Sequence, residues 1–262
     1  MINKNIKLVA LDMDGTLLDS HNRQPEDFVP WVKAHEDIQT VIASGRQYYT
    51  LKEMFPSVFD RLIFAAENGA IAFKNDKMLY SSDISQADLK WCVDYFESDK
   101  DAHVLVCGAR AAYMKHSTKA VEDTCRIYYR KLELVDSLYD ILQKDSIIKF
   151  AIYYENAKVK EAYDRLNNLP KSLELVISGK NWMDISNKGV SKGSAIEELQ
   201  RSMGISREES MAFGDYLNDY TMLKSCEESY AMENAQPELK AIAKYITASN
   251  DEDGVMKVLR QL

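Results

Sequence analysis

Two aspartates separated by one residue, Asp12 and Asp14, are the clearest indication of chemistry in this sequence. They follow the apolar residues Ile6 and Leu8 to Leu11, which predict a buried strand, and Gly15 then allows a sharp turn. A carboxylate that is ionised at neutral pH can attack phosphorus and give an acyl phosphate, which water then hydrolyses. Crowded carboxylates push their pKa values apart, so one can stay anionic while the other donates a proton. Taken alone, such a pair is more typical of a solvated acidic turn.

Further segments, far away along the chain, carry other groups that phosphoryl transfer needs. Ser44 and Gly45 follow a predicted strand, where a hydroxyl and a backbone N–H can donate to a phosphate oxygen. A simple strand-to-helix turn is the alternative there. Asp215 also follows a predicted strand and offers a hard oxygen ligand of the kind that Mg2+ prefers. Ligands of open α/β sheets bind at the carboxyl ends of the strands, so we expect these groups to share one crevice with Asp12.

Cationic side chains are candidates for binding the phosphoryl group. Lys192 lies in the first turn of a predicted helix, where a cation opposes the macrodipole at a cost of roughly a few tenths of a kcal/mol or more. A nearby phosphate would offset that cost. Lys188 is an alternative for the same role. Arg46 either reaches an anion or remains a solvated surface side chain.

Asn218 and Asp219 open the helix that follows Asp215. Their ordinary role would be to cap the helix and to oppose its dipole. For Asp219 this role is compatible with a second one, because a capping carboxylate beside a metal ion would also orient its neighbours.

The first and last parts of the chain alternate between predicted strands and helices. Strands are predicted over residues 7–12, 39–43, 62–66, 210–213 and 229–232, and helices over residues 48–55, 192–203 and 28–35, although Pro30 interrupts the last of these. Two short runs joined by Asn75 and Asp76 predict a hairpin. The expected fold class is therefore α/β, with a doubly wound, Rossmann-like parallel sheet as its core.

The middle of the chain has a different order of elements. Strands are predicted over residues 103–106, 111–115, 147–154 and 173–177, and helices near residues 87–98, 119–131 and 158–167. Strands that follow one another without long crossovers predict an antiparallel sheet, so we expect an inserted α+β cap domain. The expected boundaries are 1–81 for the first part of the core, 82–185 for the cap and 186–262 for the second part of the core.

Composition limits the partners and the location that we expect. The 262 residues can bury the cores of two domains, and a net charge of -8 without basic blocks argues against nucleic acid as a partner. No segment has the length of a membrane span, and acidic residues near the start are unlike a signal peptide. The cysteines show no metal-binding spacing. We therefore expect a cytoplasmic protein with reduced thiols that does not bind membranes.

Together these segments resemble the haloacid dehalogenase superfamily, and within it the Cof-type phosphatases that carry a large α+β cap. The resemblance spans the chain and rests on the following residues: Asp12 to Leu18, Ser44 to Arg46, Glu67 to Gly69, Lys192 with Gly193, Gly214 with Asp215, Asn218 with Asp219, Met232, Asn234 with Ala235, and Asp253 to Val255. Two positions depart from the pattern that many relatives show. Tyr216 replaces a small residue, which leaves the size of the substrate open, and Glu233 replaces a glycine.

The resemblance implies a Mg2+-dependent phosphatase with an aspartyl-phosphate intermediate. Asp12 would be phosphorylated, and Asp14 would protonate the leaving group and then activate water. Ser44, Gly45, Lys192 and Asn218 would hold the phosphoryl group. The metal would take Asp12, the backbone carbonyl of Asp14, and Asp215. The cap would close over the site and select the substrate.

Three functions are compatible with these residues. The first is a phosphatase for small phosphorylated metabolites, with sugar phosphates as the leading class and cofactor phosphates such as pyridoxal phosphate or flavin mononucleotide behind them. The second is a phosphotransferase or phosphomutase that uses the same intermediate. The third is a regulatory protein that binds a phosphorylated metabolite without turnover; such a protein would not need Asp14 beside Asp12.

Overall fold

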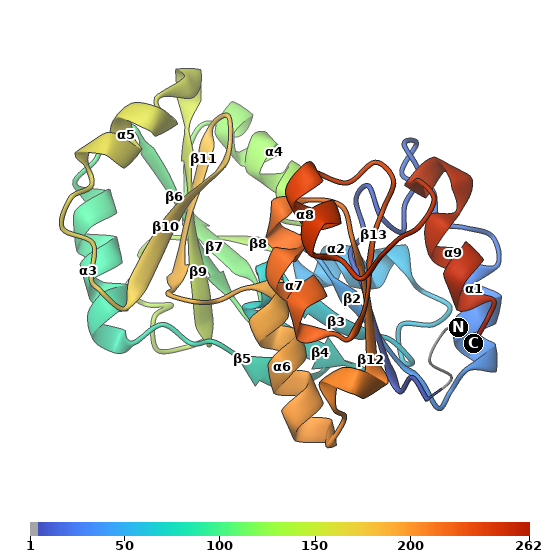
Figure 1. The fold of residues 1–262 in the computed structure, drawn as a ribbon. Coiled ribbons are helices and arrows are strands. Elements are labelled where there is room, and N and C mark those ends of the chain that lie inside the picture. Colours follow the sequence, from blue (N-terminus) through green and yellow to red (C-terminus); the bar gives the residue numbers. More distant parts are fainter. Residues whose placement is uncertain (1–4) are drawn as a thin grey trace. The chain divides into compact units, whose positions relative to one another are not determined.

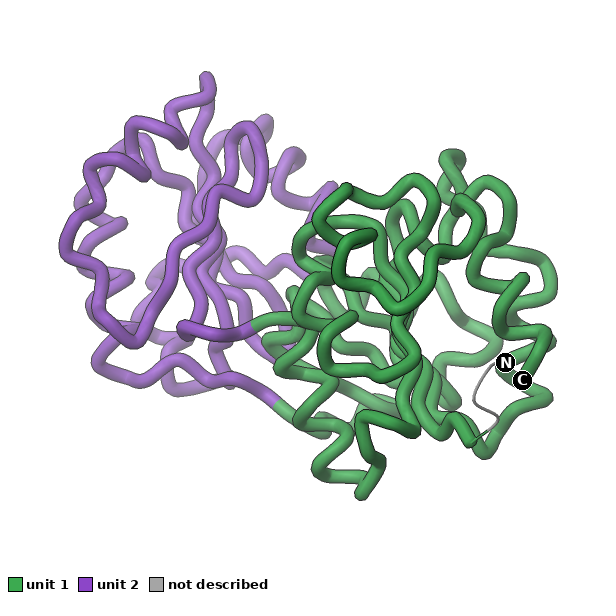
Figure 2. The backbone as a smooth tube through the Cα atoms, viewed as in Figure 1, with its two compact units in different colours: residues 1–80, 191–262 green, residues 81–190 purple. Residues whose placement is uncertain are grey.

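The computed structural model describes residues 5–262 and divides the chain into two compact units (Figure 2). Unit 1 runs to Tyr80 and resumes at Ser191, and unit 2 comprises Ser81–Val190. The predicted boundary between residues 185 and 186 falls inside the strand β11 (Trp182–Asn187), and unit 2 continues to Val190. The inserted segment therefore begins and ends between two halves of one sheet-forming unit.

Unit 1 is built on an eight-stranded sheet with the order β14-β13-β12-β1-β2-β3-β4-β5. The strands are β1 (Leu8–Leu11), β2 (Gln39–Ala43), β3 (Ile63–Ala66), β4 (Ile71–Lys74), β5 (Lys77–Ser81), β12 (Ser210–Gly214), β13 (Glu228–Ala231) and β14 (Tyr245–Ile246). The strands from β14 to β3 are parallel, and β4 pairs antiparallel with β3. β1 is buried along its whole length, as expected for a parallel strand that is covered on both faces.

Helices cover both faces of this sheet, α6 and α7 on one and α1 and α9 on the other (Figure 1). The helices of unit 1 are α1 (Phe28–Ala34), α2 (Tyr48–Met54), α6 (Lys192–Met203), α7 (Tyr220–Ser225), α8 (Pro237–Ile242) and α9 (Gly254–Leu259), with short 3-10 helices η1 (Glu67–Gly69), η3 (Arg207–Glu209), η4 (Leu217–Asp219) and η5 (Asn250–Glu252). Pro30 does not break α1, because it lies in the first turn, where no intrahelical acceptor is available for an N–H. The predicted doubly wound core is confirmed.

Two local features of unit 1 follow directly from its sequence. Asn75 and Asp76 both have positive φ, 48° and 60°, which is the conformation that a tight turn between β4 and β5 requires. Near the other edge of the sheet, the ring of Tyr230 stacks on those of both Phe213 and Tyr245, with centroids 4.9 Å apart in both pairs. The rings extend the packed face as far as the short strand β14.

Unit 2 is a second sheet, with the order β10-β11-β9-β6-β7-β8. Its elements are α3 (Gln86–Glu97), β6 (Ala102–Gly108), β7 (Ala112–Lys115), α4 (Lys119–Tyr128), β8 (Leu132–Val135), β9 (Ile147–Tyr154), η2 (Glu155–Ala157), α5 (Val159–Arg165), β10 (Leu173–Gly179) and β11. All of its pairs are antiparallel except β7 with β8, which is parallel. The expected α+β character is confirmed.

The sequence prediction missed two strands of unit 2. The helix predicted over residues 119–131 ends at Tyr128, and β8 starts only four positions later. β11 was missed although it alternates, with Met183 and Ile185 buried and Asp184 between them partly exposed. In the middle of this sheet Lys149 on β9 is buried, and its Nζ lies 3.5 Å from a carboxylate oxygen of Asp184. The polar residue Asp184 made β11 hard to recognise in the sequence, because its partner Lys149 lies on another strand.

The cysteines and the lengths of the helices are two further observations. All four cysteines lie in the described part of the chain and are buried as thiols, without disulfides. Among the helices of residues 5–262, none combines the length and the apolar character needed to cross a membrane.

Candidate active site

The parallel register of unit 1 brings three of the predicted site segments to one edge of the sheet. Asp12 directly follows β1, Ser44 directly follows β2, and Asp215 directly follows β12. β1 lies between the other two strands, and the backbone N–H of Asp12 donates to the carbonyl of Phe213 at 3.1 Å. Because parallel strands end at the same edge, their carboxyl-terminal residues are neighbours.

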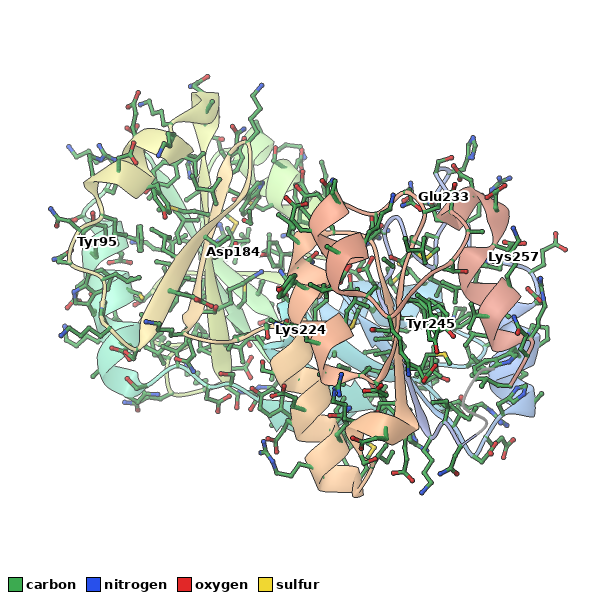
Figure 3. The ribbon with its side chains drawn as sticks, in the orientation of Figure 1. Tyr95, Asp184, Lys224, Glu233, Tyr245 and Lys257 are labelled. Atoms are coloured by element: carbon green, nitrogen blue, oxygen red, sulfur yellow. The ribbon has the colours of Figure 1, made fainter. Side chains whose placement is uncertain are left out.

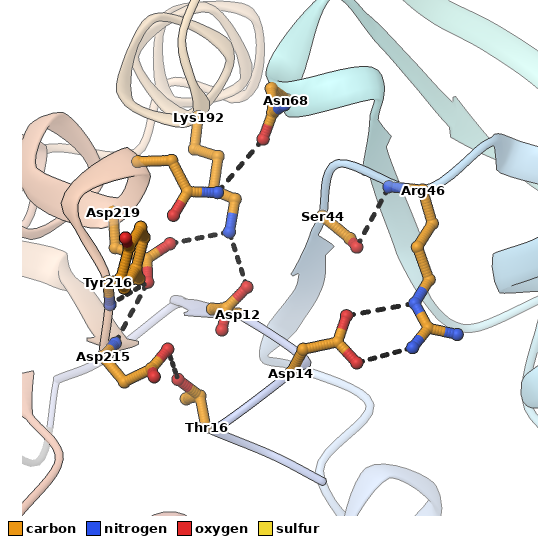
Figure 4. Close-up of polar contacts among 11 residues, drawn as sticks. Asp12, Asp14, Thr16, Ser44, Arg46, Asn68, Lys192, Asp215, Tyr216 and Asp219 are labelled. Carbon is orange, nitrogen blue, oxygen red and sulfur yellow. Dashed lines mark hydrogen bonds and ion pairs between the residues drawn. The ribbon is translucent and has the colours of Figure 1, made fainter. Parts of the chain in front are cut away.

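Lys192 forms a buried ion cluster with two of the aspartates (Figure 4). Its Nζ donates to Oδ1 of Asp12 at 2.5 Å and to Oδ1 of Asp219 at 2.7 Å. The Lys192 side chain is 1% exposed and that of Asp219 is fully buried. Burial alone would lower the pKa of Lys192, but the two carboxylates outweigh it and hold the pKa above its usual value. The ammonium group therefore stays charged within the cluster.

The position of this lysine is fixed by the start of α6. Ser191 caps the helix: its hydroxyl accepts from the N–H of Ser194, whose own hydroxyl accepts from the N–H of Ser191. A cation in this first turn opposes the helix dipole. In the structure two carboxylates compensate it. Lys188, the alternative for this role, is exposed and belongs to unit 2.

Asp215 completes a cluster in which carboxylate oxygens of Asp12, Asp215 and Asp219 all lie within 4.8 Å of one another. Burial, and then the charges of Asp12 and Asp219, raise the pKa of Asp215 to about 7. Burial and the charge of Asp12 raise the pKa of Asp219 to about 6, although Lys192 acts against this. One lysine does not balance three carboxylates, so the cluster favours the binding of a further cation.

The hydrogen bonds within the cluster separate a structural carboxylate from those available to a metal. Asp219 accepts Lys192 on one oxygen, and its other oxygen accepts the backbone N–H groups of Asp215 and Tyr216 at 3.0 and 3.2 Å. Asp12 uses Oδ1 for Lys192, and Asp215 uses Oδ1 for the hydroxyl of Thr16 at 3.3 Å. Oδ2 of Asp12 and Oδ2 of Asp215 lie outside these bonds. Hard oxygen donors of this kind fit Mg2+.

Gly15 allows the turn after Asp14 to pass close to Asp215. Its φ is +81°, and a Cβ built on it would lie 2.4 Å from Oδ2 of Asp215. Its carbonyl accepts the side-chain amide of Asn234 at 2.8 Å. A side chain at position 15 would therefore both strain the backbone and displace a carboxylate of the cluster.

The side chain of Asp14 does not face Asp12, although the two aspartates were expected to act together. Arg46 donates to both oxygens of Asp14, from Nε at 3.0 Å and from Nη2 at 2.5 Å. The carboxylate of Asp14 points toward Arg46 and away from Asp12 (Figure 4), and its side chain is 52% exposed. Arg46 therefore forms an ion pair with Asp14, and its contact with a substrate anion stays a prediction.

The other residues predicted to bind phosphate lie around this cluster. Ser44 is buried, and its Oγ accepts the N–H of Arg46 at 3.2 Å. Gly45 directly follows Ser44, and a Cβ built on it would lie 3.2 Å from the side-chain amide of Asn68. Asn218 is exposed and donates its side-chain amide to Oδ1 of Asn68 at 3.1 Å. Tyr216 and Glu233, the two positions that depart from the family pattern, are both exposed. Glu233 is labelled in Figure 3.

Sequence reasoning gave no role to three residues that the structure places in this network: Thr16, Asn68 and Asn234. Each lies in a segment that the resemblance had quoted. The family resemblance could therefore have indicated that these residues lie near the site. Only the folded chain shows which atom each side chain contacts.

The doubly wound sheet gathers three aspartates and a buried lysine at its carboxyl edge, an arrangement that suits an enzyme of phosphoryl transfer. The family model of haloacid dehalogenase-like hydrolases matches residues 9–259, and the chain belongs to this family. The predicted membership, including the Cof-type subfamily, is confirmed.

Individual relatives agree with this assignment. The Escherichia coli K12 protein named 5-amino-6-(5-phospho-D-ribitylamino)uracil phosphatase YbjI is 32% identical over 261 residues, which cover 97% of this chain and 95% of the relative. The Bacillus subtilis phosphatase YcsE, which has the same substrate in its name, is 28% identical, with 98% and 95% coverage. The crystal structure of SMU.1108c from Streptococcus mutans UA159 superposes with a TM-score of 0.80 at 30% identity and 98% coverage of both chains. The protein is thus a phosphoric monoester hydrolase.

Proposed function

We propose that this phosphatase is Mg2+-dependent, acts on small phosphomonoesters and forms an aspartyl phosphate on Asp12. The observation that carries the proposal is the buried contact of Lys192 with Asp12 and Asp219, directly beside Asp215. The lysine leaves Oδ2 of Asp12 outside its hydrogen bond, and it supplies positive charge where a phosphate would arrive. This arrangement suits a nucleophilic carboxylate that works on an anionic substrate.

The reaction takes place in two steps. A carboxylate oxygen of Asp12 attacks phosphorus, the bond from phosphorus to the ester oxygen breaks, and the leaving oxygen takes a proton from Asp14. Water then attacks the phosphorus of the acyl phosphate and gives a proton to Asp14, and inorganic phosphate leaves Asp12 free. Asp14 must turn from its position beside Arg46, or move together with that arginine, to reach the leaving oxygen.

The remaining groups position the phosphoryl group and neutralise its charge. Ser44, Gly45, Lys192 and Asn218 would donate hydrogen bonds to its oxygens. Asp12, Asp215 and the backbone carbonyl of Asp14 would hold Mg2+, which supplies charge neutralisation for the transferred phosphoryl group when it is bound. Asp219 would hold the lysine and the backbone of Asp215 in place rather than bind the metal.

Sugar phosphates and related polyol phosphates are the substrate class that we propose. Three relatives, YbjI, YcsE and YwtE, have 5-amino-6-(5-phospho-D-ribitylamino)uracil in their names, a compound with a primary phosphate at the end of a sugar-derived chain. With a net charge of -8, the protein attracts an anionic substrate only through local cations. Lys192 and a bound metal provide that local charge.

The proposal is tested by phosphate release from a panel that contains sugar phosphates, ribityl phosphates, pyridoxal phosphate and flavin mononucleotide. We expect release with Mg2+, none with a chelator, and none from Asp12→Asn, whose fold should be unchanged by circular dichroism. Retained turnover in that variant would refute the nucleophilic role of Asp12. Formation of an isomer without free phosphate would assign the enzyme to transfer between hydroxyls.

A further inference from the structure

Asn68 lies in a turn of unusual backbone conformation next to the predicted phosphoryl site. Three consecutive residues have positive φ: Glu67 at 52°, Asn68 at 55° and Gly69 at 89°. Left-handed backbone suits glycine, is tolerated by asparagine and is rare for glutamate. Such conformations persist only where the surroundings impose them, and they cluster at functional sites.

The surroundings impose this turn from two directions. The N–H of Glu67 donates to the carbonyl of Arg46 at 3.1 Å, and the N–H of Asn68 donates to the carbonyl of Ser44 at 2.9 Å. On the other side, a Cβ built on Gly69 would lie 2.2 Å from the carbonyl oxygen of Ser191, the residue that caps the helix of Lys192. The turn is thus fixed against both segments that flank the site.

The side chain of Asn68 lies between two residues that we propose to hold the phosphoryl group. Its Oδ1 accepts the amide of Asn218 at 3.1 Å (Figure 4), and a Cβ built on Gly45 would lie 3.2 Å from both its Nδ2 and its Oδ1. An amide nitrogen carries two hydrogens. Within residues 5–262, no protein acceptor takes a hydrogen from Nδ2 of Asn68.

We propose that Asn68 is a further substrate-binding residue of this enzyme. Its Nδ2 donates to an oxygen of the phosphoryl group. Its Oδ1 accepts the amide of Asn218 and so holds that side chain where it also faces the phosphoryl oxygens. This inference rests on the proposed function of the site. The strained backbone of residues 67–69 then positions the side-chain amide of Asn68 between Gly45 and Asn218.

The test compares matched substitutions in two similar turns. Unit 2 contains a second Glu-Asn turn, in which Asn156 has φ 56° and ψ 33° against 55° and 33° for Asn68. Asn68→Asp keeps the shape, the backbone tolerance and the acceptor oxygen, and it replaces the donor by a negative charge. Asn68→Gly keeps the backbone and removes the amide. Asn156→Asp and Asn156→Gly are the controls.

The measured quantities are the competitive inhibition constant of inorganic phosphate and the melting temperature. We expect the constant to rise at least about tenfold in Asn68→Asp and severalfold in Asn68→Gly, because a donor to an anion is lost. Both Asn156 variants should keep the wild-type constant. A constant within twofold of wild type in Asn68→Gly would overturn the proposal, even if the melting temperature falls, since Asn68 would then have only a structural role.

Failure of the proposed function would give a different result. If the wild type releases no phosphate from any compound, the same variants are compared by calorimetric titration with inorganic phosphate in the presence of Mg2+. Weaker binding by Asn68→Gly than by wild type would support the site independently of turnover. Equal binding by the two proteins, or none by either, would refute it.

Discussion

Replacing Lys192 by methionine should destabilise unit 1 strongly and abolish turnover. The side chain is 1% exposed, and its ammonium group contacts Asp12 and Asp219 at 2.5 and 2.7 Å. Removing one partner of a buried ion pair costs about 3–5 kcal/mol of unfolding free energy, because the remaining charge is left buried and unpaired. With a slope of about 3 kcal/mol per molar urea, the unfolding midpoint should fall by about 1 to 1.7 M.

The assay is urea unfolding without metal, with a control and a second substitution. Lys257→Met removes an exposed lysine of unit 1 (Figure 3) and should change the free energy by less than about 0.5 kcal/mol. Adding Asp219→Asn to Lys192→Met should recover part of the loss, since it removes one of the unpaired charges. A loss below about 1 kcal/mol in Lys192→Met, or strictly additive effects in the double variant, would refute this electrostatic reasoning.

Two further predictions concern the turn and the ion pair beside the cluster. Gly15→Ala should lower stability by more than about 1 kcal/mol and abolish turnover, because its Cβ would lie 2.4 Å from Asp215 at φ +81°. Gly204→Ala is the control, because Gly204 has φ +64° and a Cβ built on it has no atom within 4 Å. This variant should lose only the stability that the strained backbone costs, and it should keep its activity. Equal activities in the two variants would contradict the argument. Arg46→Lys keeps a charge but loses the two-point contact with Asp14. If Asp14 moves together with Arg46 to reach the leaving oxygen, the arginine orients the general acid, and kcat should fall by about tenfold to a hundredfold with little change in KM. A kcat that does not fall would show that Asp14 acts after leaving Arg46. A raised KM with unchanged kcat would instead assign Arg46 to substrate binding.

Much of unit 1 could be predicted from local sequence. The strand predicted over residues 39–43 and the helix predicted over residues 192–203 match β2 and α6, because continuous apolar runs and a capped amphipathic pattern have few alternatives. Unit 2 was predicted less completely. β8 and β11 are short and partly polar, and Asp184 of β11 has its partner, Lys149, on another strand.

By itself, the sequence determined which residues could form the site. Asp12, Ser44 and Asp215 each follow a buried parallel strand, and the geometry of parallel sheets places such residues at one edge. This inference needs only the type and order of the elements. The order of the segments also carries the family resemblance, which the family model confirms over residues 9–259.

Only the tertiary structure decided which side chains contact one another. It pairs Asp14 with Arg46, gives Asp219 to Lys192, and brings Asn68 to Asn218, over sequence separations of 32, 27 and 150 residues. No local pattern encodes these contacts, because they depend on which loops the packed strands and helices bring within hydrogen-bond distance. The sequence therefore selects the chemical groups of the site, and the packing of distant elements assigns each group its partner.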